Sequence, residues 1–100
     1  MTTPAGILSD FASILLLFRD HPDKKEEQKQ AFRRLTANLP DGDHQLRVTQ
    51  AGFRWDHIEI PVGRGEVAAL HDQFRQHGVG EVRIPSGLMS STLLSLVRIL

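Results

Sequence analysis

The stretch from Gln45 to Val62, QLRVTQAGFRWDHIEIPV, decides how the rest of the chain folds. Leu46 and Val48 alternate with polar neighbours, which is the pattern of a strand with one buried face. A short turn containing a glycine follows, and Phe53 and Trp55 then restore the alternation on a returning strand. The stretch therefore predicts a β-hairpin whose apolar face carries the only tryptophan of the chain.

Helices are predicted on both sides of this hairpin. Apolar residues recur at helical spacing from Ile7 to Phe18, and more sparsely from Ala31 to Leu39. After the hairpin, the pattern predicts a helix beginning at Glu66, a short strand over Glu81 to Ile84 and a last helix capped by Ser90. The predicted fold class is α+β, with two N-terminal helices, a hairpin, and then helix, strand and helix. The simplest arrangement is a three-stranded sheet with the helices packed on one face.

A chain of 100 residues has room for one hydrophobic core. Residues 1–6 are expected to form a flexible leader, because Pro4 and Gly6 discourage regular structure, and residues 7–100 a single domain. The last helix is apolar nearly all round, up to the final residue. It is therefore expected to continue into, or pack against, something outside these residues, as in the N-terminal part of a larger protein. A homodimer interface is the alternative.

Charge and composition argue against several functional classes. Twelve basic residues balance twelve acidic ones, whereas nucleic-acid-binding domains show a basic excess. The chain has no cysteine, which excludes disulfides and thiolate chemistry. The longest apolar run, Ile14 to Phe18, is too short to span a bilayer, and no signal peptide is recognisable. We expect a cytoplasmic protein without nucleic-acid or membrane partners.

The histidines and their acidic neighbours suggest few sites. His71-Asp72 matches the dipeptide of HD-type metal phosphohydrolases, but without further ligands it is interpreted as solvated helix surface. Asp41, Asp43 and His44 are close enough to bind a divalent cation weakly, although turn chemistry explains the two acids equally well.

Two other segments resemble parts of known sites. Asp56 and His57 suggest an acid–base pair, but adjacent strand residues point to opposite faces and would not meet. Gly63-Arg64-Gly65 precedes a helix, as phosphate loops do, but lacks their spacing and is interpreted as a flexible joint. No catalytic, cofactor-binding or metal-binding residue is predicted, and we do not expect an enzyme.

Motifs spread over most of the chain resemble an accessory module found at the N-terminus of larger bacterial proteins. Those proteins carry an HD-GYP phosphohydrolase domain or HEAT-type helical repeats further along. The motifs are Leu17-Phe18-x-x-His21-Pro22, Phe53-Arg54-Trp55-Asp56, His77-Gly78-Val79-x-Glu81-Val82-Arg83-Ile84-x-x-Gly87-Leu88 and Leu93-x-x-Leu96-Val97-x-Ile99-Leu100.

The family commonly forms a tight turn with a glycine where this chain has His57. Histidine tolerates a positive φ better than most residues, so a second turn over Trp55 to Ile58 stays open. In that case Glu59-Ile60 would form a separate strand, and the sheet would have four strands.

The resemblance implies a non-catalytic module for regulation, docking or oligomerisation in a signalling or scaffold protein. Its partner would be another protein, a downstream domain of the same chain, or a second copy. The first and last helices are the expected contact surfaces, through Leu16, Leu17, Leu94, Ile99 and Leu100. The alternative is a sensor of a small ligand or nucleotide that binds near the hairpin at Trp55, His57 and Arg64.

Overall fold

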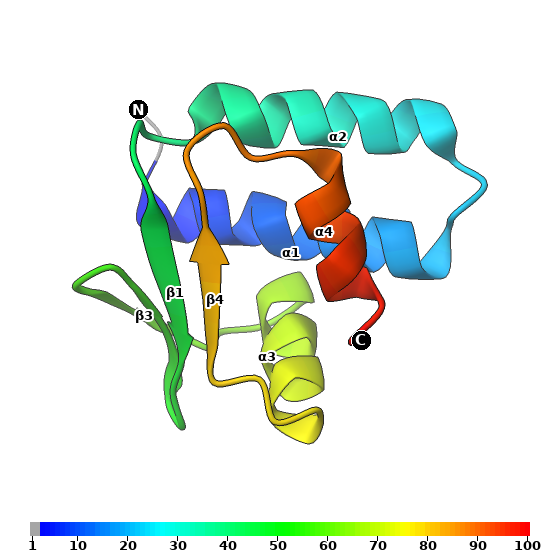
Figure 1. The fold of residues 1–100 in the computed structure, drawn as a ribbon. Coiled ribbons are helices and arrows are strands. Elements are labelled where there is room, and N and C mark those ends of the chain that lie inside the picture. The colour runs from blue at the N-terminus through cyan, green and yellow to red at the C-terminus, as the bar shows by residue number, and fades with distance from the viewer. Residues whose placement is uncertain (1–2) are drawn as a thin grey trace.

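The computed structural model describes residues 3–100, which fold into four helices and four strands (Figure 1). The predicted α+β class is confirmed. In chain order the elements are α1 (Pro4–Asp20), α2 (Lys25–Asn38), β1 (His44–Val48), β2 (Gly52–Trp55), β3 (Ile58–Pro61), α3 (Glu66–Gln76), β4 (Glu81–Ile84) and α4 (Ser90–Val97).

The sheet is antiparallel and has the strand order β3-β2-β1-β4. Leu46 lies between Trp55 on one side and Val82 on the other, so the predicted hairpin is confirmed. A second turn joins β2 to β3, with Trp55 opposite Ile58, and the sheet therefore has four strands rather than three. The residue with positive φ in this turn is Asp56, at 53°, and not His57.

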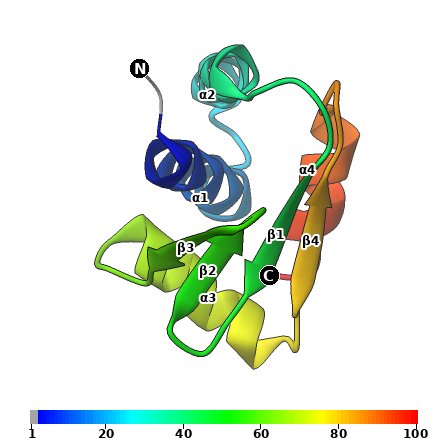
Figure 2. The same cartoon turned by 90° about the vertical axis from the view of Figure 1, so that its left-hand side faces the viewer.

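The two faces of the sheet differ in chemistry. The apolar face carries Leu46, Phe53 and Val82, which are buried beneath the helices in one core cluster. In Figure 2, α3 passes behind β2 and β1, where it packs against both strands. On the opposite face, the strand registers align four charged residues in one row: Glu59, Arg54, Arg47 and Glu81. The helices thus cover one face only, as an antiparallel sheet permits.

The first helix begins earlier than predicted. Pro4 occupies its first turn, where a missing N–H costs nothing, and the side chain of Thr3 accepts a hydrogen bond from the Gly6 N–H at 3.1 Å. The prediction of a flexible leader is therefore wrong for Pro4 to Gly6, which are helical, and residues 1 and 2 lie outside the described part. From this position α1 packs against α2, α3, α4 and β3.

Glycine is required where β2 passes close to β3. A Cβ at Gly52 would lie 2.3 Å from the Ile60 carbonyl oxygen and 2.7 Å from the Val62 nitrogen. Neither is the end of a flexible side chain, so the backbone would have to shift. Gly52 thus permits the second hairpin to pack tightly against the end of the first.

Glycine also ends α3 as the sequence predicts. Gly78 has a φ of 69°, the Val79 N–H donates to the Phe74 carbonyl at 2.8 Å, and the Gly78 N–H donates to the Arg75 carbonyl at 3.3 Å. These two bonds form a Schellman motif, which satisfies carbonyls at the end of the helix. The chain then enters β4 directly.

Candidate functional site

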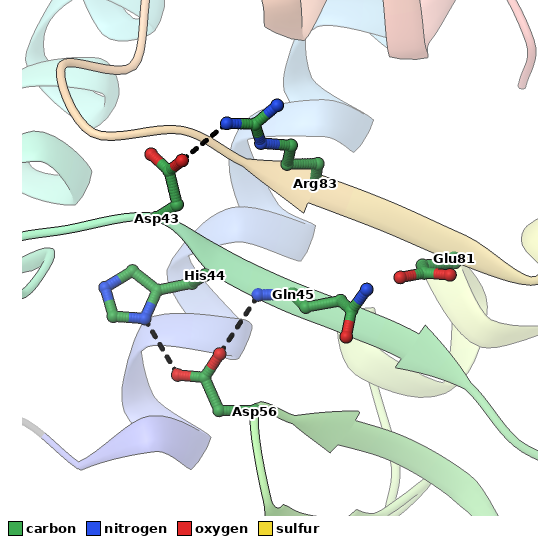
Figure 3. A pocket seen from close by; sticks show the side chains of 6 residues that line it. All are labelled: Asp43, His44, Gln45, Asp56, Glu81 and Arg83. Atoms are coloured by element: carbon green, nitrogen blue, oxygen red, sulfur yellow. Dashed lines mark hydrogen bonds and ion pairs between the residues drawn. The ribbon is translucent and has the colours of Figure 1, made fainter.

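A cavity lined only by polar and charged residues lies where the start of β1 meets the β2–β3 turn. It has a volume of about 500 Å³ and is lined by Asp43, His44, Gln45, Asp56, Glu81 and Arg83. Figure 3 shows the ion pairs of this polar corner, with His44 turned toward Asp56 and Arg83 toward Asp43. Glu81 lies further along β4, away from both pairs (Figure 3).

His44 has an acceptor at each ring nitrogen. Its Nδ1 lies 2.8 Å from Oδ2 of Asp56, and its Nε2 lies 3.0 Å from the carbonyl oxygen of Pro40. A neutral imidazole has a single N–H and could donate to only one of them, whereas the imidazolium donates to both. Burial opposes the charge, but the bonds to Asp56 and Pro40 outweigh it, so the pKa of His44 is raised.

Asp56 joins the second turn to the first strand. Its Oδ1 accepts from the Gln45 N–H at 3.1 Å, and its own N–H donates to the Gln45 carbonyl at 2.9 Å. The hydrogen bonds from His44 and from the Gln45 amide hold the pKa of Asp56 below its ordinary value. Aspartate tolerates the left-handed region better than most residues, which suits it to this position.

Asp43 holds the loop between β4 and α4. Its Oδ1 accepts from the Ser86 N–H at 2.8 Å, and its Oδ2 pairs with the guanidinium of Arg83. The Ser86 amide, followed by Arg83, lowers the pKa of this exposed carboxyl group. The adjacent residues Asp43 and His44 thus fasten two different loops to the start of β1.

These contacts define what the corner can do chemically. Both nitrogens of His44 are occupied by acceptors within the chain, so the ring is not placed as a general base for an external molecule. Asp43 and His44 face different partners rather than a shared cation. Over residues 3–100, no three His, Asp or Glu side chains converge as metal ligands.

The residues proposed for ligand binding do not share one cavity. Trp55 is 3% exposed, and its ring stacks on His44 with centroids 4.9 Å apart. His57 is exposed in the β2–β3 turn, and Arg64 is exposed in the segment before α3. Trp55 therefore packs in the core and against the polar corner, and His44 already covers one face of its ring.

His71 is not solvated helix surface, so that interpretation is wrong. It is half-buried, its Nε2 donates to the Thr49 carbonyl at 2.7 Å, and its ring meets Phe53 edge-on at 5.4 Å. His71 therefore ties α3 to the end of β1. The sequence did contain a signal, because His71 adjoins Leu70 and precedes Phe74 by three residues, on the buried side of the helix.

The predicted contact residues of the first helix lie in a groove between α1 and α2. Leu16 and Leu17 are half-buried there, beside Ala31 of α2 and polar side chains from both helices. At one end Ser13 donates a hydrogen bond to Glu66, which joins α1 to the start of α3. The packing within the chain already covers part of both leucines.

The last helix leaves more apolar surface uncovered. Leu94 is 47% exposed, Ile99 44%, and Met89, which precedes the helix, 66%. Leu93 is buried, and Leu100 packs against the core as a partly buried residue. Of the predicted contact residues in this region, Leu94 and Ile99 are open to a partner, and Leu100 is partly used by its own domain.

No family model, curated protein or solved structure was found to match the chain. The similarity to the accessory module of HD-GYP and HEAT-repeat proteins therefore stays a hypothesis. Among residues 3–100, no helix combines the length and apolar character that a membrane span requires.

Proposed function

We propose that this chain is a non-catalytic protein-interaction module with a regulatory, docking or oligomerising role in a bacterial signalling or scaffold protein. The observation that carries the proposal is the exposure of three large apolar side chains in and next to α4: Leu94 (47%), Ile99 (44%) and Met89 (66%). Burying a fully exposed side chain of this kind is worth about 1.5–3 kcal/mol, so a partner that covers the exposed half of each would stabilise the complex by roughly half of that per residue.

The polar corner supports the same proposal from another side. Its histidine and carboxylates are hydrogen-bonded to one another and to the backbone, an arrangement that stabilises loops. The small-ligand alternative gains no comparable support, because Trp55 is buried and its two companions lie in separate turns. Interaction through apolar surface is therefore the function that the geometry supports best.

Site-specific photo-crosslinking tests the proposal in the cells that naturally produce the chain. A photoreactive phenylalanine derivative in place of Leu94 is expected to give a discrete protein adduct. The same group in place of Lys29, which is exposed on α2, is the matched control and should give none. Absence of a discrete adduct at position 94, or equal adducts at both positions, would overturn the proposal.

A further inference from the structure

The two edge strands of the sheet differ in whether they can accept another strand. The strand order places β3 at one edge and β4 at the other. Within residues 3–100, no strand pairs with the outer side of either. Exposed edges bind other strands unless they are blocked, so the backbone groups at each edge decide which of them is available.

The edge at β3 is blocked. The Val62 N–H donates to the Ala51 carbonyl at 3.2 Å. Because backbone groups alternate in direction along a strand, those of Ile58 and Ile60 also point toward β2. Those of Glu59 and Pro61 therefore point outward. Because proline has no N–H, this edge lacks one of the donors that a further strand would need.

The edge at β4 has no proline within Glu81–Ile84, so every outward-facing N–H and C=O group of the strand is available. The Val48 N–H donates to the Gly80 carbonyl at 2.9 Å, so the backbone groups of Val82 and Ile84 point toward β1. The N–H and C=O groups of both Glu81 and Arg83 therefore point outward. In Figure 1 no other element lies in front of β4, and in Figure 2 it is the outermost strand on its side.

The sequence of this edge is complementary to itself. We consider a second copy whose β4 runs antiparallel to this one, with the two Val82 residues opposite each other. Glu81 of each copy then lies opposite position 83 of the other, an arginine. The backbone groups of these two residues are the ones that point outward, so hydrogen bonding and charge pairing require the same register. The side chains of both residues are exposed on the open face. Arg83 also pairs with Asp43 of its own chain, but its side chain is 74% exposed and can be reached by a second carboxylate.

The helix layer extends this surface. The last helix lies behind β4 at the same side of the molecule in Figure 2, and it carries the exposed Leu94. A two-fold axis through the β4 edge would bring the α4 helices of both copies to the same side of the joined sheet. The exposed apolar side chains at α4 of the two copies would then lie on the same side of the joined sheet.

We infer that a second copy of this chain docks on the β4 edge, which joins two four-stranded sheets into one eight-stranded sheet with α4 alongside the junction. The inference rests on the proposed function and names its partner. A second copy fits this edge because Glu81 and Arg83 become complementary to themselves across the two-fold axis. A strand from a different protein would need an arginine and a glutamate at the same spacing to match both charges.

The first experiment measures the solution mass of the full chain by light scattering over a range of concentrations. Twice the monomer mass is expected, and amide exchange at Glu81 and Arg83 should slow as the dimer forms. Glu81→Pro removes an outward-facing N–H and also the carboxylate that would pair with position 83 of the second copy. The fold is expected to persist, while the dimer dissociation constant rises about tenfold or more. Glu59→Pro at the β3 edge is the matched control and should dimerise like the parent.

Charge exchange tests the register. Glu81→Arg and Arg83→Glu each place like charges opposite one another at two sites of the dimer, and about tenfold weaker association is expected. Arg83→Glu also breaks the ion pair with Asp43 inside the chain, and the double variant breaks it equally, so a comparison of these two isolates the pairs across the axis. The double variant restores those pairs and should associate within about threefold of the parent. A dimer that ignores Glu81→Pro, or a double variant weaker than both single ones, would overturn the inference.

The two proposals fail in different ways. A chain that stays monomeric at every concentration, yet gives a discrete crosslink at position 94 to another protein, would overturn the dimer and leave the proposed function standing. A monomeric chain without any crosslink would overturn both.

Discussion

The helices α1 and α4 are both apolar on more than one side, but the rest of the chain covers them to different extents. In α1 the residues Ile7, Leu8, Phe11, Ile14 and Leu15 are at most 2% exposed, because α2, α3, α4 and β3 surround the helix. In α4 Leu93 is equally buried, but Leu94 beside it is 47% exposed. A helix that is apolar on several sides needs cover on several sides, and only α1 receives it within the chain.

The largest expected effect comes from equal truncations in the two helices. Leu15→Ala should lower the free energy of unfolding by about 3 kcal/mol, because it removes fully buried atoms and leaves a cavity. Leu94→Ala should lower it by less than about 1 kcal/mol. Urea unfolding at a low protein concentration, where association is minimal, measures both. Equal losses would mean that α4 is as well covered as α1.

Charged substitutions should separate stability from association. Leu16→Glu is expected to cost about 1–2 kcal/mol of unfolding free energy, because the side chain is half-buried against α2. Leu94→Glu should change it by no more than about 0.5 kcal/mol but abolish association measured by light scattering. If both variants associate like the parent, the predicted contact surfaces are wrong.

The helix caps differ as the burial does. Thr3 caps α1 with its side chain. The predicted cap at Ser90 is wrong, because Ser90 is the first residue of α4 and Met89 occupies the cap position without a side-chain cap bond. Thr3→Ala is therefore expected to destabilise the chain by about 1 kcal/mol, and Met89→Asp to stabilise it by up to about 1 kcal/mol. Thermal unfolding measures both changes: the melting temperature should fall in Thr3→Ala and rise in Met89→Asp. Shifts of the same sign would contradict the prediction.

The smallest expected effect is a change of stability with pH. It arises because His44, which fastens the loop after α2, bonds to both of its acceptors only when its ring is protonated. The pKa of His44 is raised, so its contribution to stability is complete below its ordinary value of about 6.5 and is lost as pH rises through the folded value. The loss should be about 1 kcal/mol or less, comparable to one hydrogen bond.

Asp56 acts in the opposite direction. Its pKa is lowered, so its contribution is complete above its ordinary value of 3.8 and is lost as pH falls through the folded value. Between these limits both partners are charged. Chemical unfolding across the pH range should show the loss at high pH in the parent and in His57→Gln, whose residue is exposed, and not in His44→Gln. A loss that persists in His44→Gln would assign it to another group.

The polar corner shows where reasoning from sequence stops. The hairpin register alone places Asp56 beside Gln45, so the contact of Asp56 with the first strand could have been found. The sequence leaves the second turn open because His57 stands where a glycine would mark it. The positive φ falls instead on Asp56, and an aspartate is a weaker turn signal than a glycine. The bond from His44 to the Pro40 carbonyl depends on the path of a loop, and no periodicity encodes that path.

Local sequence patterns predict most of the elements and their apolar faces, but they place the start of α1 too late and leave β3 open. Alternation specified the strands, helical spacing specified the helices, and Gly78 specified the end of α3, because each of these signals acts over a few neighbouring residues. Which apolar face is covered depends on how all the elements pack together. The side chains of α1 are buried by segments as distant in the sequence as α4. Such long-range packing depends on the whole chain and not on the conformational preference of neighbouring residues. The sequence names Leu94 as a contact residue, but its exposure beside the buried Leu93, and the open edge at β4, depend on the placement of every element.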